Sequence, residues 1–251
     1  MFPGIGTLVN AATVLLGATL GVLLGHRLPE RTRSVVTDAL GLITLLIAAS
    51  SAMAVADSSL SDAVGDSAPM LIVLGALLTG GIIGSSLRIE DRLAGLGGTL
   101  QRVVVRRFGG PEHHGRERFI EGFVTSSLIF CVGPLTIIGA LSEGIGDGPQ
   151  QLFLKSALDG FAAIAFAASF GWGVAAAALV VLVVQGGLTA LGAALGTFLP
   201  DAHLAALTAT GGLLLVGVAL RLLDLKPVRV GDLLPALVMA PIITQIVIIL
   251  R

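Results

Sequence analysis

The chain contains little charge and few aromatic side chains. Lys, Arg, Asp and Glu make up 12% of its 251 residues, about half the share of an ordinary soluble domain. Aromatic residues make up 4%, and Tyr is absent. A soluble globule of this size needs a charged surface, which so few charges cannot form. The shortage of charge excludes a soluble domain, and the 55% hydrophobic content excludes a disordered chain.

Several other features are also missing. The single cysteine, Cys131, excludes a disulfide framework and a thiolate metal site. A net charge of −1 gives no basic excess for a nucleic-acid partner. We find no zinc motif, no Gly-x-Ser-x-Gly motif and no histidine cluster, so we expect neither an enzyme nor a bound metal or cofactor. The opening residues 1–6 lack the basic region of a signal peptide, so we expect the first apolar run to stay in the mature protein.

The chain is rich in long apolar runs and in glycine, with 34 Gly residues. A bilayer core of about 30 Å requires roughly 20 apolar residues per helix. Eight runs meet this length: Gly4–Gly25, Val35–Ala56, Pro69–Leu87, Phe119–Leu141, Leu152–Phe170, Trp172–Leu199, His203–Leu222 and Leu233–Leu250. They predict an all-α polytopic membrane bundle of about eight transmembrane helices in the lipid bilayer.

Basic residues are distributed asymmetrically between these runs. Thirteen of the fifteen Lys and Arg residues fall in the first, third and seventh connecting segments, and the exceptions are Lys155 and Arg251. The positive-inside rule places those three segments in the cytoplasm and both termini outside it. The longest, 89–118, predicts a basic amphipathic helix over 91–108 on the inner leaflet. A plain linker that obeys the same charge bias is the alternative.

An internal repeat relates the two ends of the chain. A shift of 171 residues aligns Leu20–Ala48 with Leu191–Ala219, including Gly41 with Gly212, and a shift of 166 pairs the next Asp-x-x-Pro elements. The copies are five helices apart, so they cross the membrane in opposite directions. We therefore predict an inverted-topology repeat of helices 1–3 (within 1–88) and 6–8 (within 172–251) around the central pair in 119–171. Many secondary transporters are built this way, with a site near the midplane at the repeat interface, and some channels share the device.

Glycines recur at four-residue spacing in three of the runs. Such small-residue faces let helix backbones approach closely. Packing within the bundle is the first interpretation, and a homodimer interface is the alternative. The faces are Gly17/Gly21/Gly25, Gly80/Gly84 and Gly192/Gly196.

The central pair carries unusual polar chemistry. Gly133 and Pro134 predict a break in the fourth helix, which frees carbonyl oxygens near 129–130 to line a cavity. A kink repaired by neighbouring groups is the alternative. Lys155 and Asp159 stand at i and i+4, where they can pair, and Asp159 lies about two turns inside the fifth apolar run.

An ionisable residue inside the membrane is expensive and suggests a functional site. Asp159 could bind a cation or a proton, with Lys155 as a counter-ion displaced on occupancy, or the pair could be purely structural. Asn10 could add a carbonyl oxygen, whereas Gln185 and Gln245 are interpreted as interhelical hydrogen bonds. The complete candidate site is Asn10, Gly133, Pro134, Glu143, Lys155, Ser156 and Asp159.

Four short motifs stand out, GTLVNAA at 6–12, GALxEG at 139–144, KSxxD at 155–159 and GGLLL at 211–215. With them the chain resembles the DUF554 (YqgA/YdfK-like) family of bacterial inner-membrane proteins of unknown function. The resemblance implies a polytopic prokaryotic plasma-membrane protein and carries no established activity. Asn10, Glu143, Lys155 and Asp159 match the family pattern, and Asp38 does not.

The sequence favours a transporter of a small solute or ion, with its site between the repeats and the central pair. A passive channel lined by the same residues is the first alternative. The second is a membrane scaffold, or a sensor that acts through the basic helix, without transport.

Overall fold

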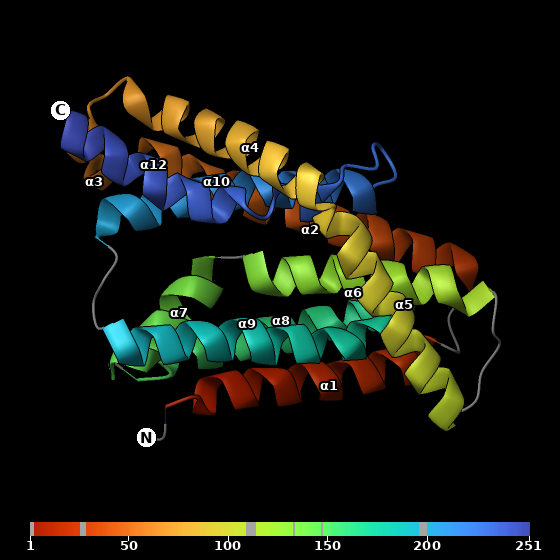
Figure 1. Cartoon of the computed structure of the whole chain (residues 1–251). Helices are drawn as coiled ribbons and strands as arrows, with labels where there is room; N and C mark the ends of the chain where they lie inside the picture. The colour runs from red at the N-terminus through yellow and green to blue at the C-terminus, as the bar shows by residue number, and fades with distance from the viewer. Residues whose placement is uncertain (1–2, 26–28, 109–113, 133, 147, 196–199) are drawn as a thin grey trace. The chain divides into compact units, whose positions relative to one another are not determined.

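The computed structural model describes residues 3–25, 29–108, 114–132, 134–146, 148–195 and 200–251 (Figure 1). Within these ranges the chain is helical and contains no strand. The elements are α1 (Ile5–Gly25), α2 (Glu30–Ala52), η1 (Met53–Ala56), α3 (Ser58–Val64), α4 (Ala68–Leu87), α5 (Ile89–Phe108), α6 (His114–Val132), α7 (Pro134–Ile145), α8 (Gln150–Phe170), α9 (Gly173–Leu195), α10 (Asp201–Leu222), α11 (Val230–Leu233) and α12 (Ala236–Leu250).

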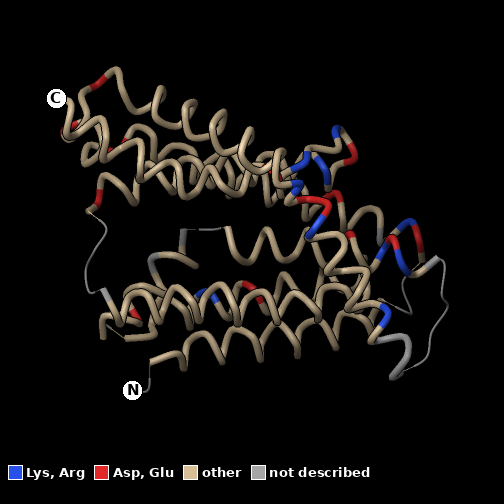
Figure 2. Tube along the Cα trace, in the orientation of Figure 1, with Lys and Arg blue, Asp and Glu red and all other residues tan. Residues whose placement is uncertain are grey.

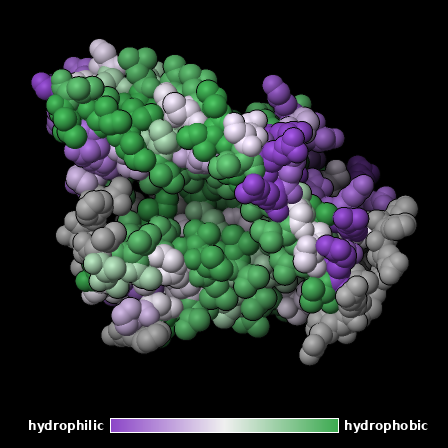
Figure 3. Space-filling model, viewed as in Figure 1, coloured by the Kyte–Doolittle hydropathy of each residue, from purple (hydrophilic) through white to green (hydrophobic). Residues whose placement is uncertain are grey.

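The helices confirm a polytopic membrane bundle. Seven stretches of the described chain are long and apolar enough to cross a membrane, and α6 with α7 makes an eighth if this bent pair is one span. All eight predicted runs fall on these stretches. Apolar side chains cover much of the visible face, and hydrophilic residues gather toward the helix ends (Figure 3). That distribution suits a surface that contacts lipid.

Two predicted segments differ in detail from the structure. The second apolar run begins earlier than predicted, at Glu30, and the acidic connection after it contains the short helix α3. Asp57 caps α3, because its Oδ1 accepts the Ser59 N–H at 2.9 Å. The basic segment forms α5, which packs onto α6 through Gly97 and leaves Leu96 and Val103 exposed.

The chain divides into two compact units. Unit 1 contains residues 1–40, 91–131 and 135–196, and unit 2 contains 41–90, 132–134 and 197–251. Unit 1 therefore holds α1, α5, α6 and α7 almost entire, α8 and α9. The division falls within α2, whose residues 30–40 belong to unit 1 and 41–52 to unit 2. Unit 2 also holds η1, α3, α4, α10, α11 and α12.

In unit 1, α1 lies directly on the backbone of α8. A Cβ atom added at Gly17, Gly21 or Gly25 would lie 2.3, 2.2 and 2.6 Å from the carbonyl oxygens of Gly160, Ile164 and Ala168, respectively. Both series advance by four residues in the same sense, so α1 and α8 run parallel. The predicted small-residue face of α1 is thus occupied within the chain, and a homodimer would need another surface.

In unit 2, α2 and α10 make two reciprocal contacts. A Cβ at Gly41 would meet Leu222 and Leu223, and a Cβ at Gly212 would meet the backbone of Ser51 and Ala52. Adding 171 to 41, 51 and 52 gives 212, 222 and 223, the same shift that aligns the two sequence segments. A contact between i and j that recurs with the roles exchanged is typical of a twofold relation.

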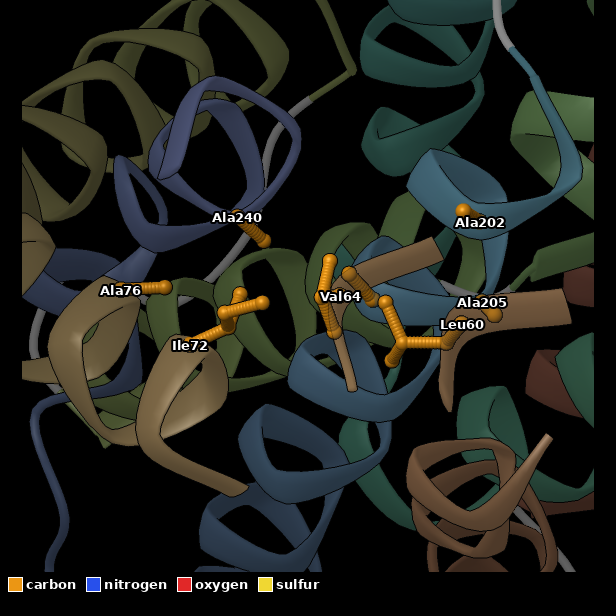
Figure 4. Packing of buried hydrophobic residues seen from close by; sticks show 8 residues of the cluster. Leu60, Val64, Ile72, Ala76, Ala202, Ala205 and Ala240 are labelled. Carbon is orange, nitrogen blue, oxygen red and sulfur yellow. The ribbon is translucent and has the colours of Figure 1, made fainter. Parts of the chain in front are cut away.

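The interior of unit 2 is an apolar cluster built from α3, α4, α10 and α12 (Figure 4). Its members are Leu60, Val64, Ile72, Ala76, Ala202, Ala205, Ala206 and Ala240. Five of these eight residues are alanines, so the helix backbones come close together. The short helix α3 contributes Leu60 and Val64, which explains why an acidic connection folds into a helix here.

A polar clamp holds the junction of α4 and α5 in unit 2. Arg221 Nη1 donates to Glu90 Oε1 at 2.7 Å, and the Gly231 N–H donates to Glu90 Oε2 at 2.6 Å. Asp232 Oδ1 accepts the Glu90 N–H at 3.0 Å. The clamp joins the basic end of α10 to α11 and satisfies backbone donors that no helix pairs.

We predict that Gly21→Ala destabilises the protein by about 1–3 kcal/mol, because the new methyl group overlaps a carbonyl oxygen of α8. The matched control is Gly187→Ala in α9, where an added Cβ meets nothing within 4 Å. Alanine there should be neutral or stabilising, since it favours the helix by up to about 1 kcal/mol. Thermal unfolding in detergent measures both, and equal midpoints for the two variants would contradict the packing.

Candidate functional site

A lysine and an aspartate pair inside α8. Lys155 Nζ donates to Asp159 Oδ2, and the two side chains are only 5% and 11% exposed. Asp159 is the tenth of the 21 residues of α8, so it lies about 14 Å from the first residue of the helix and about 17 Å from the last. Figure 2 shows this pair as the blue and red segments in the middle of α8, away from the charges at helix ends. The geometry matches the predicted i, i+4 pairing.

Asn10 connects this pair to two more helices. Its Nδ2 donates to Asp159 Oδ2 at 3.0 Å and to Gln185 Oε1 at 3.1 Å. Asn10 and Gln185 are both fully buried. Side chains of α1, α8 and α9 therefore form one hydrogen-bonded cluster, Asn10–Lys155–Asp159–Gln185, called the polar cluster below.

Gln185 was not among the predicted site residues. Its interpretation as an interhelical hydrogen bond is right about the bond, but the partner is the site residue Asn10. The sequence did offer one sign that Gln185 belongs to the site: it is a single amide in the middle of an apolar run, at the same depth as Asn10 and Asp159. Gln245 likewise bonds across helices, to His203 Nε2 at 3.0 Å.

Glu143, near the end of α7, contacts the N-terminus of α1. Its Oε1 accepts the Gly6 N–H at 2.7 Å, and the residue is only 3% exposed. A carboxylate at a helix N-terminus interacts favourably with the helix dipole. The next residue, Gly144, packs on α9, where an added Cβ would lie 2.2 Å from the Thr189 carbonyl oxygen. Glu143 therefore joins the end of α7 to α1 and α9.

The predicted break in the fourth span is present. The axes of α6 and α7 differ by 72°, and Pro134 is the first residue of α7, whereas Gly133 lies outside the described residues. Pro134 cannot donate to the Phe130 carbonyl, and the Thr136 hydroxyl donates to that oxygen instead, at 2.8 Å. The break is therefore repaired locally at Phe130. Phe130 also packs on α8, where its ring lies edge-to-face on that of Phe166.

Ser156 occupies a simpler environment than predicted. It is buried, but its hydroxyl donates to the Leu152 carbonyl of its own helix at 2.6 Å. Of the predicted site residues, Asn10 and Lys155 thus both bond directly to Asp159. Glu143 bonds to α1 one helical turn before Asn10.

Several buried polar atoms around the cluster have no hydrogen-bond partner. They are Thr7 Oγ1, Asn10 Oδ1 and Glu143 Oε2, together with Gln185 Nε2 and Thr189 Oγ1. Buried polar groups in native proteins are nearly always satisfied by protein, water or ligand. These atoms give the region both donors and acceptors for a small polar species. No group of three or more His, Cys, Asp and Glu side chains that could hold a metal occurs in the described part of the chain.

We predict that Asp159→Asn lowers the free energy of unfolding by about 3–5 kcal/mol, because it leaves the Lys155 ammonium buried without a counter-ion. The double variant Lys155→Met/Asp159→Asn removes both charges and should recover most of that loss. Unfolding of the wild type, the two single variants Lys155→Met and Asp159→Asn, and the double variant gives the coupling energy. A double variant no more stable than Asp159→Asn would show that the pair is not coupled.

Comparison with known proteins covers nearly the whole chain. The family model "Protein of unknown function (DUF554)" matches residues 5–245. The uncharacterized protein YqgA of Escherichia coli (strain K12) is 33% identical over 236 residues, 94% of each chain. The uncharacterized membrane protein YdfK of Bacillus subtilis (strain 168) is 24% identical over 242 residues, 96% of each chain. No solved structure matches. The chain is therefore a multi-pass membrane protein that belongs to the DUF554 family.

Proposed function

We propose that this protein transports a small solute or ion across the membrane and binds it at the polar cluster. The observation that carries the proposal is the buried Lys155–Asp159 pair, which Asn10 links to a third helix through Gln185. Charged side chains inside membrane helices are rare and mark substrate or ion pathways.

The unpartnered hydrogen-bond donors and acceptors of the polar cluster favour binding over a purely structural role. A cluster that only held helices together would satisfy its own donors and acceptors, because each unsatisfied buried group is costly. Here the carbonyl oxygen of Asn10 and the amide nitrogen of Gln185 have no partner. They offer one acceptor and one donor to an occupant beside the ion pair.

The predicted repeat also supports transport. Asn10 and Gln185 come from α1 and α9, the first helices of the two repeats, which contact each other and run in opposite directions (Figure 1). The reciprocal contacts of Gly41 and Gly212 in unit 2 have the same shift as the sequence repeat. Sites where two inverted repeats meet are characteristic of secondary transporters.

The ion pair favours a transporter over a passive channel. Lys155 occupies Asp159 Oδ2 in this conformation, so a cation that bound Asp159 would have to displace it. Such an exchange of partners gives two states with different contacts, which alternating access requires. A conducting pore needs weaker binding sites that ions leave rapidly.

We also infer that the protein lies in the bacterial cytoplasmic membrane. Both of its termini then lie outside the cytoplasm. The parallel course of α1 and α8 supports an even number of spans, because three crossings between them give α8 the direction of α1. The basic connecting segments then lie inside. A reporter that is active only outside the cytoplasm, fused after Arg251, should be active, and an inactive fusion would reject this orientation.

A thiol-accessibility experiment tests transport without knowledge of the substrate. Ser156→Cys is placed in a Cys131→Ala background, because the Ser156 hydroxyl bonds only within its own helix in this structure and lies one turn from Asp159. A charged, membrane-impermeant thiol reagent is applied to right-side-out cells and to inverted vesicles. Alternating access predicts labelling from both faces, and planar-bilayer recordings should show no unitary currents.

The control is Ala206→Cys, which lies in the apolar cluster of unit 2 and is fully buried. It should remain unlabelled from both faces. An unreactive Ser156→Cys would favour the scaffold or sensor alternative, and labelling from one face alone would contradict alternating access. Unitary currents would favour the channel.

A further inference from the structure

Four of the unpartnered buried atoms in unit 1 are oxygens that belong to one region. They are Thr7 Oγ1, Asn10 Oδ1, Glu143 Oε2 and Thr189 Oγ1, called the oxygen group below. Each of these residues is at most 4% exposed. All four atoms can accept a hydrogen bond or ligate a cation, and one of them is a carboxylate oxygen.

Contacts made by three helices converge on this region. Glu143 bonds the N–H of Gly6, the residue before Thr7, and Gly144 packs against the carbonyl of Thr189. Asn10 lies three residues after Thr7, on the same side of α1, and bonds Gln185, which lies one turn before Thr189 on α9. The antiparallel course of α1 and α9 therefore sets Thr7 opposite Thr189, as Asn10 lies opposite Gln185.

The orientation of the Asn10 amide is fixed by chemistry. Asp159 can only accept when ionised, so the atom of Asn10 that contacts it is the donor Nδ2. The Asn10 carbonyl oxygen has no partner and belongs to the oxygen group. One side chain thus gives its donor to the ion pair and its acceptor to the oxygen group.

We propose that the oxygen group binds a monovalent alkali cation between α1, α7 and α9. Oxygen-only donor sets suit hard cations, and a single carboxylate among three neutral oxygens balances one positive charge. Glu143 Oε1 already accepts the Gly6 N–H, so its unpartnered Oε2 is the carboxylate oxygen left for the cation.

In the proposed transport function, this cation would be the coupling ion. That coupling role rests on the proposed function. A cation that ligates Asn10 Oδ1 holds the amide in the orientation in which Nδ2 bonds Asp159 and Gln185. Occupancy of the oxygen group therefore organises the polar cluster, which is the requirement for cooperative binding of a cation and a solute. Binding of the cation itself can be measured without any transport.

Thermal unfolding of the purified full-length protein tests the site. The unfolding midpoint is recorded in increasing NaCl, KCl or LiCl, with choline chloride keeping the ionic strength constant. A specific site predicts saturable stabilisation by at least one alkali cation. Thr189→Val and Thr7→Val each remove one oxygen at nearly constant shape, and each should raise the half-saturating concentration about tenfold, equivalent to ~1.4 kcal/mol. Glu143→Gln keeps an acceptor for Gly6 but removes the charge, and should abolish saturation.

The matched control is Thr125→Val, which removes another buried, unpartnered hydroxyl, on α6. It should leave the half-saturating concentration unchanged. The proposed site would be rejected if no alkali cation raised the unfolding midpoint more than choline does. It would also be rejected if Thr125→Val and Thr189→Val raised the half-saturating concentration equally. Cation binding that depends on Thr189 in a protein whose Ser156→Cys variant is unreactive from both faces would keep this site and reject transport.

Discussion

The close approach of α1 to α8 is the constraint on which the arrangement of unit 1 depends. Three glycines of α1 lie against carbonyl oxygens of α8, where any side chain would collide. In a bilayer such contacts replace the hydrophobic effect as the force between helices, because lipid chains are as apolar as the side chains. This contact fixes the register of the two helices, and the register brings Asn10 to Asp159 and Gly6 to Glu143. Small residues at one end of α1 thereby position polar residues at the other.

The polar residues of unit 1 are arranged around the depth at which charge is least tolerated. Lys155 and Asp159 neutralise each other, and Asn10 extends their hydrogen bonds to α9. A buried ion pair is weak evidence for stability, since apolar residues of the same volume often stabilise a protein as well. Together with five nearby polar atoms that lack partners, the pair is better explained as part of a binding site. At the 72° bend between α6 and α7, local repair by Thr136 lets the chain break without leaving the Phe130 carbonyl unpaired.

Much of this could be predicted from the sequence, because the bilayer imposes strong rules. Apolar run length identified the seven spanning helices and the bent α6–α7 pair, Gly133–Pro134 identified the break, and i, i+4 spacing identified the Lys155–Asp159 pair. Partners far apart along the chain could not be predicted, since a lone Gln185 or Thr189 in an apolar run does not indicate which helix it faces. The helix α3 was missed because its cap, Asp57, stands in a segment that reads as an acidic loop. The division into two units was also beyond the sequence, since each unit draws on distant parts of the chain.

The central claim is that the polar groups of α1, α8 and α9 bind a ligand and do not merely hold the helices together. A density map of the protein in lipid nanodiscs containing sodium, at a resolution that shows ordered water, tests it most directly. We predict distinct density within hydrogen-bonding or ligand distance of Asn10 Oδ1 and Thr189 Oγ1. A dry interface in which these two oxygens bond to protein groups, with no density between them, would contradict the claim.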